Sequence, residues 1–71
     1  MIKVINKIRL ERARRDADAK RDHFSWFASG ILESYGDDMA DWPSPAPIDF
    51  QMKRRDMHRA FDRVRVLEAR V

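Results

Sequence analysis

The amino-acid sequence predicts an all-α protein, an antiparallel two-helix hairpin that dimerises into a four-helix bundle. Two observations lead to this fold class. In both halves of the 71-residue chain, apolar residues recur every seven positions, with a second series three positions later. This is the pattern of amphipathic helices that pack along one seam. Between the halves, three prolines stand within residues 43–47, and proline is not tolerated inside a helix.

The first helix is expected over residues 3–35. Its seam combines a series of apolar residues with a second, more mixed series: Leu10, Ala17, Phe24 and Ile31, then Ala13, Lys20, Phe27 and Ser34. Gly36 suits the left-handed conformation that commonly follows the end of a helix. Residues 1–10 leave two alternatives open, because their apolar and polar residues alternate as in a strand. They either extend the helix or form a short strand that pairs across a dimer.

The second helix is expected over residues 47–70, after a connection at 36–46. Its seam again combines two series: Phe50, Met57, Val64 and Val71, then Lys53, Ala60 and Leu67. Pro47 suits the first turn of a helix, and Asp49 is favourable near the positive N-terminal end of the helix dipole. A connection this short between two long helices makes them antiparallel neighbours.

Residues 1–71 are expected to form one domain, and its small size predicts a homodimer. A core in a domain below about 70–80 residues rarely contributes more than about 3–5 kcal/mol. The chain has no cysteine, so disulfides cannot add to that stability. Ile2, Ile5, Ile8 and Trp26 lie off the seam, and a second protomer would remove them from water.

Charge is segregated along the chain. Residues 1–21 hold eight basic and three acidic residues, a net charge of +5, and residues 53–71 hold seven and three, a net charge of +4. Residues 22–52 hold six acidic and no basic residues, a net charge of −6. In a hairpin, the two basic segments lie side by side and the acidic segment forms the other end, so we expect a bipolar molecule.

Aromatic residues around the acidic segment predict a protein-binding region. Trp26 lies off the seam, Tyr35 at the end of the first helix and Trp42 in the connection. Exposed Trp and Tyr residues are frequent hot spots of protein interfaces. The acidic residues expected around them are Asp37, Asp38 and Asp41. Two alternatives stay open: Trp42 folds back to close the end of the hairpin, and Trp26 is buried in the dimer interface.

The alternative function is nucleic-acid binding by the paired basic helices. Its candidate residues lie on both helices: Arg12, Arg15, Arg55, Arg59 and Arg63. Such a density of arginine can neutralise phosphates. However, acidic residues stand three or four positions from many basic ones, a spacing that favours ion pairs on a solvated helix face. These pairs are Arg12/Asp16, Glu11/Arg15, Arg14/Asp18, Asp16/Lys20, Asp18/Arg21, Asp56/Arg59 and Asp62/Arg65.

The sequence favours no enzymatic chemistry. His23 and His58 are the two histidines of the chain, and no nucleophile stands in a fixed relation to either. With two glycines, Gly30 and Gly36, the chain has no glycine-rich phosphate loop. The aspartates of the connection match neither a calcium loop nor a glycosidase pair. We expect a protein that is not an enzyme and needs no cofactor or metal.

The sequence also predicts a cytoplasmic location and no membrane partner. No apolar run approaches the roughly 20 residues of a membrane helix. The N-terminal residues lack the apolar segment and cleavage site of a signal peptide.

In its size, its lack of cysteine and its helical-hairpin character, the whole chain resembles the small phage-encoded proteins that bind and inhibit host regulators. Among these are the quorum-sensing anti-activators of Pseudomonas phages. The resemblance rests on no diagnostic residues, and therefore assigns no binding residues. It implies a small module that inhibits or retargets a larger protein, such as a host transcriptional regulator, by occupying its surface.

Overall fold

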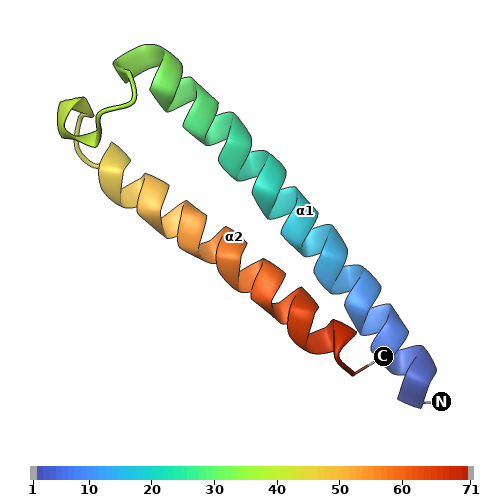
Figure 1. Cartoon of the computed structure of the whole chain (residues 1–71). Helices are drawn as coiled ribbons and strands as arrows, with labels where there is room; N and C mark the ends of the chain where they lie inside the picture. Colours follow the sequence, from blue (N-terminus) through green and yellow to red (C-terminus); the bar gives the residue numbers. More distant parts are fainter. Residues whose placement is uncertain (1, 71) are drawn as a thin grey trace.

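The computed structural model describes residues 2–70, and these form two long helices joined by a compact turn (Figure 1). Helix α1 spans Ile2–Tyr35, the short 3₁₀ helix η1 spans Met39–Asp41, and α2 spans Ala46–Glu68. The helices pack antiparallel in a rod of 52 × 15 × 15 Å, and no strand occurs within residues 2–70. The all-α hairpin predicted from the sequence is confirmed.

The N-terminal residues continue α1 and do not form a strand, so the strand alternative is wrong. The helix begins at Ile2, whereas the sequence predicted a start near residue 3. Nothing in residues 2–10 breaks a helix, and extending an existing helix is favourable because its nucleus has already formed. Figure 1 shows this first part of α1 reaching beyond the end of α2, and Ile2, Val4, Ile5 and Ile8 are exposed there.

The ends of the helices at the turn follow from local chemistry. Gly36 has φ +81°, the left-handed conformation expected after α1, and its N–H donates to the carbonyl oxygen of Leu32 at 3.0 Å. The Asp38 carboxylate accepts from the N–H of Ala40 at 3.0 Å and caps η1. Helix α2 begins with proline in its first turn, where the missing N–H costs no helical hydrogen bond.

Small side chains let the two helices approach closely in the half of the hairpin that carries the chain ends. The buried core there consists of Leu10, Ala13, Ala17, Ala60, Val64 and Leu67, with Phe61 packed against it. Ala17 is completely inaccessible to solvent. Of these residues, three are alanines, whose small side chains allow the backbones to come close. Within residues 2–70, the predicted seam is therefore the packed interface, although its second series includes Lys20 and Ser34, which are exposed. Val71 of the predicted seam lies outside the described residues.

Aromatic rings fill the other half, next to the turn. The Phe50 ring lies between Phe24 and Trp42, with ring centroids 5.0 and 5.1 Å apart. Trp42 is 7% exposed, and its indole Nε1–H donates to the carbonyl oxygen of Gly36 at 2.8 Å. Of the two alternatives for Trp42, the structure has the one in which the ring folds back and closes the end of the hairpin.

Substitution of Ala17 tests the close approach of the helices. Ala17→Leu adds volume where no space remains, so we expect a loss of about 1–3 kcal/mol in the free energy of unfolding. Denaturant unfolding followed by circular dichroism measures this loss. The same change at the exposed Ala40 is the control and should leave stability nearly unchanged. Equal stability of both variants would contradict the packing described here.

Substitution of Trp42 tests the closure of the turn. Trp42→Ala removes a buried ring, and we expect it to lower the free energy of unfolding by about 3–5 kcal/mol. Trp42→Phe keeps an aromatic ring but leaves the Gly36 carbonyl without its donor, so a smaller loss of about 0.5–1.5 kcal/mol is expected. Thermal melts of both variants measure the difference, and an unchanged melt for Trp42→Ala would show that the ring is not packed.

Candidate functional site

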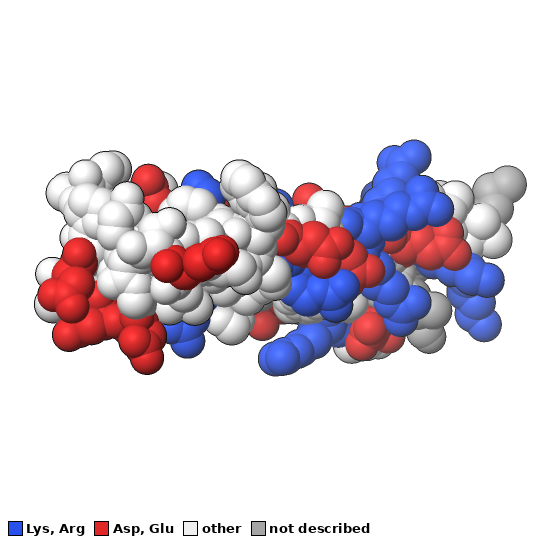
Figure 2. All heavy atoms as spheres, turned by 90° about the horizontal axis from the view of Figure 1, so that it is seen from above, with Lys and Arg blue, Asp and Glu red and all other residues white. Residues whose placement is uncertain are grey.

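The two ends of the rod carry opposite charge. Figure 2 shows basic side chains gathered toward the end formed by the chain termini, with acidic side chains among them, and a cluster of acidic side chains at the turn. The surface between is mostly uncharged. The hairpin brings the N-terminal basic segment alongside the C-terminal one, as Figure 1 shows, and this confirms the predicted bipolar arrangement. The basic end is therefore the first place to look for a binding site for an anionic partner.

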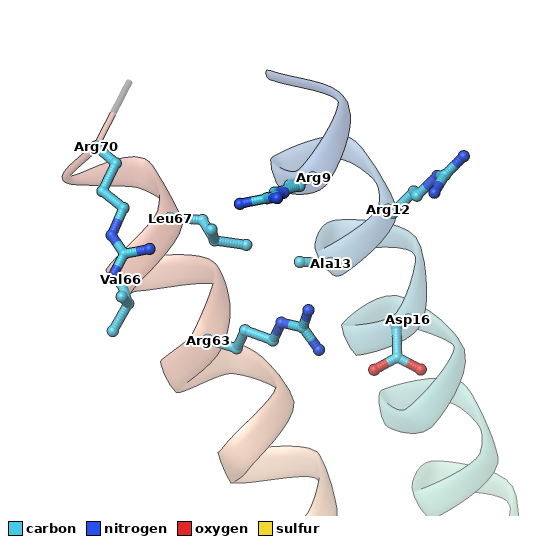
Figure 3. A pocket seen from close by; sticks show the side chains of 8 residues that line it. All are labelled: Arg9, Arg12, Ala13, Asp16, Arg63, Val66, Leu67 and Arg70. Carbon is cyan, nitrogen blue, oxygen red and sulfur yellow. The ribbon is translucent and has the colours of Figure 1, made fainter. Parts of the chain in front are cut away.

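A groove between the helices at this end is lined mainly by arginines (Figure 3). Its volume is about 650 Å³, and its lining is Arg9, Arg12, Ala13, Asp16, Arg63, Val66, Leu67 and Arg70. Ala13 and Leu67, both buried, form an apolar floor. In Figure 3 the side chains of Arg9 and Arg63 extend from opposite helices into the space between them, whereas Arg12 points away from α2.

The four arginines of the groove share its lining with one acidic residue, Asp16. Within residues 2–70, none of Arg9, Arg12, Arg63 and Arg70 forms an ion pair. Asp16 is the acidic residue of the lining, and its carboxylate pairs with Lys20 at 3.3 Å. The groove thus presents guanidinium groups, which bind carboxylates and phosphates through paired hydrogen bonds.

On the opposite side of the same seam, an ion pair joins the two helices. Arg14 on α1 contacts Glu68 on α2 at 3.2 Å, with both side chains about half exposed. Within residues 2–70, the other ion pairs are local to one helix. Of the pairs predicted from spacing, Asp16/Lys20, Asp18/Arg21 and Asp62/Arg65 form; an unpredicted contact joins Arg21 to Asp22. The predicted pairs Arg12/Asp16, Glu11/Arg15, Arg14/Asp18 and Asp56/Arg59 are absent among residues 2–70.

The turn region brings together only part of the predicted protein-binding set. Tyr35 is 48% exposed, and Asp37, Asp38 and Asp41 are exposed around the turn. Trp42 is buried by contact with Phe50, as described above. The interpretation of Trp42 as an exposed anchor is therefore wrong, because the ring fills the end of the hairpin and is not available to a partner.

Trp26 is also exposed, at 74%, more than Tyr35. It lies on the side of α1 that faces away from α2, and the nearby His23 ring is 6.3 Å away between centroids. Beside it is a shallow hollow of about 370 Å³ that reaches along α1 to Gly30. The remaining predicted basic residues, Arg15, Arg55 and Arg59, are exposed and do not line the arginine groove.

Arg9 and Arg70 belong to the two basic segments of the sequence, and a further signal indicates that they lie on one side of the hairpin. Arg9, Arg63 and Arg70 each stand directly before a residue of the first seam series, as does Asp16. In an antiparallel pair of helices, positions on the same flank of the two seams face each other. Reading the residues beside the seam as well as within it would have placed these arginines on one side of the hairpin.

In comparisons with known proteins, no family model, curated protein or solved structure matches the chain. Among residues 2–70, no cluster of three or more histidine or acidic side chains is arranged to hold a metal ion. The described helices also include none with the length and apolar character needed to span a membrane. The arginine groove is therefore the site whose geometry says most about function.

The two flanks of the seam differ in charge, and this difference predicts how substitutions at Arg63 and Glu68 change the stability of the hairpin. Arg63→Glu places a carboxylate opposite Arg9, and we expect a slight gain in stability of about 0.2–1 kcal/mol, the range of exposed ion pairs. Glu68→Arg removes the pair with Arg14 and should lower stability slightly. Thermal melts at low salt measure both shifts, and they should shrink as salt is added. A lower melting temperature for Arg63→Glu would mean that Arg63 does not face Arg9.

Proposed function

We propose that this chain is a non-enzymatic binding module that takes an acidic segment of a larger protein into the arginine groove. Occupying that segment would inhibit or retarget the larger protein, for example a host transcriptional regulator. The proposal rests on one observation: arginines surround an apolar floor, and these arginines form no ion pair among residues 2–70. Arginines held near one another raise the free energy of the unbound protein, and an acidic ligand relieves that repulsion.

The apolar floor favours a protein segment over a nucleic acid as the ligand. The floor offers apolar contact area to aliphatic side chains, through Ala13, Leu67 and the half-exposed Val66. A phosphate backbone has no aliphatic side chains that could use this area. A volume of about 650 Å³ accommodates only a few side chains. The lining also includes Asp16, whose charge opposes a continuous line of phosphates.

The bipolar charge of the molecule supports the same function through the rate of encounter. The basic end attracts an acidic partner over several ångströms, while the acidic turn repels it. The partner is therefore oriented toward the groove before contact, which raises the association rate more than it slows dissociation.

Fluorescence anisotropy with synthetic probes tests the proposal. One probe is a peptide of glutamate and leucine, the second is polyglutamate of equal charge, and the third is a short DNA duplex. We expect the glutamate–leucine peptide to bind most tightly, because it uses both the arginines and the apolar floor. Removing one charge-assisted hydrogen bond costs about 1.5–3 kcal/mol, so Arg63→Ala should weaken its binding about tenfold or more.

The matched control is Arg55→Ala, which makes the same change in net charge at an exposed position outside the groove. It should leave peptide affinity within about twofold of the original, since only long-range attraction is lost. Equal losses in Arg55→Ala and Arg63→Ala would contradict a groove-specific site. Tightest binding to the DNA duplex, with a steep fall in affinity as salt rises, would establish the nucleic-acid alternative instead.

A further inference from the structure

A continuous stripe of side chains runs along the side of α1 that faces away from α2. Its members are spaced alternately three and four residues apart: Ile5, Ile8, Arg12, Arg15, Ala19, Asp22, Trp26 and Ser29. This is the spacing of one helix face, and all eight residues are exposed. The stripe contains three large apolar residues that are 45–74% exposed, Ile5, Ile8 and Trp26, so it is a face without a partner inside the hairpin.

Two copies of the stripe, placed antiparallel, would set several complementary residues opposite each other. Counted outward from residue 17, Ile8 and Trp26 are equally distant on the two sides, and so are Ile5 and Ser29. The same symmetry pairs Arg12 with Asp22, a cation with an anion. Two copies of α1 placed antiparallel about this centre would therefore set Ile8 against Trp26 twice and pair Arg12 with Asp22 twice. In the remaining pairs, Ile5 lies opposite Ser29 and Arg15 lies opposite Ala19.

We propose that this stripe is the contact between two copies of the chain in a symmetric, antiparallel dimer centred beside residue 17. Ile8 of each copy packs on Trp26 of the other, and Arg12 of each copy pairs with Asp22 of the other. Such a contact is isologous, with the same surface patch contributed by both subunits, as in most homodimers. The stripe shares one residue with the arginine groove, Arg12, which lines the groove but points away from α2, whereas Arg9, Arg63 and Arg70 are not part of the stripe.

The hollow beside Trp26 is a place where a side chain of the second copy can bind. It is lined along α1 from Trp26 to Gly30 and Ile31, with Glu33 at its edge. A Cβ atom built on Gly30 would meet nothing within 4 Å, so the helix backbone there is open to a side chain from outside. In the antiparallel arrangement, Ile5 of the second copy lies opposite Ser29 and enters this hollow.

The distribution of charge favours the antiparallel orientation over the parallel one. Residues 1–21 carry a net charge of +5, whereas the rest of α1 from residue 22 to 35 contains Asp22 and Glu33 and no basic residue. Antiparallel copies set the basic part of each α1 on the acidic part of the other, and parallel copies would set like charges together. The four helices then lie in a row, with α1 and its copy in the middle, unlike the bundle predicted from the sequence.

Charge reversal tests the pairing of Arg12 with Asp22. By analytical ultracentrifugation, we expect the chain to be a dimer of twice its 8.5 kDa mass, and Arg12→Asp and Asp22→Arg each to weaken the dimer by about tenfold or more through like-charge contacts. An equimolar mixture of the two variants should dimerise like the original chain, since both cross-chain pairs are restored. Arg59→Asp, an equal charge change at an exposed position on α2, is the control and should leave the dimer intact.

Disulfide trapping tests the register of the two α1 helices in the dimer. Because the chain has no native cysteine, only the introduced cysteines can react. A mixture of Ile5→Cys and Ser29→Cys chains should form a cross-chain disulfide on mild oxidation. Either variant alone should not, because identical positions lie about 36 Å apart along the antiparallel helices at 1.5 Å per residue. Ser34→Cys, on a different side of α1, replaces Ser29→Cys in the control mixture and should not react with Ile5→Cys.

Two results would overturn the proposal. A monomer at micromolar concentration, with full helicity, would mean that the stripe has no second copy as its partner. A dimer that forms the disulfide within the Ile5→Cys variant alone, or that is unaffected by reversal at Arg12, would mean a different orientation. Neither result bears on the peptide affinities that test the groove, so the two proposals fail separately.

Discussion

The close packing of Ala13, Ala17 and Ala60 is the interaction on which the other features of this structure depend. Small side chains at the seam let α1 and α2 approach along the half of the rod that carries the chain ends. Because the helices are close there, residues that flank the seam face each other across a narrow space. Arg9 and Arg63 become neighbours for this reason, and Arg14 reaches Glu68 on the other flank. Wider helix spacing would have separated all of these groups.

The turn is stabilised by a different kind of packing, which complements the alanine seam. The rings of Phe24, Phe50 and Trp42 fill the wider space next to the connection, and the hydrogen bond from Trp42 to Gly36 ties that ring to the end of α1. Lys53 adds a cation–π contact, with its ammonium nitrogen 4.8 Å from the Phe27 ring centroid. A small hairpin without disulfides thus draws on core packing at both ends.

The surface of the hairpin divides into regions with separate physical roles. The groove between the helices concentrates arginines over an apolar floor, which suits an acidic ligand and costs stability in its absence. The outward stripe of α1 instead carries apolar residues toward its two ends and charged residues between them, and Arg12 and Asp22 lie at equal distances from its centre. Arg12 lies at the border, since it lines the groove but points away from α2 (Figure 3). A second copy on the stripe would leave the Arg9 and Arg63 side of the rod facing solvent.

Four features follow from the sequence alone: the two helices, the seam between them, the left-handed glycine after α1 and the opposite charge of the two ends. Each of these depends on periodicity or on local backbone chemistry, which a single chain segment carries within itself. The sequence does not distinguish helix from strand over residues 2–10, because alternation alone does not exclude an extension of the neighbouring helix. The closure of the turn by Trp42 depends instead on packing between distant segments, since a residue in an irregular connection has no periodic pattern that indicates its direction. The tertiary structure also decides that Arg9, Arg63 and Arg70 line one groove, because contacts between two helices depend on their relative register and spacing, which no residue specifies alone.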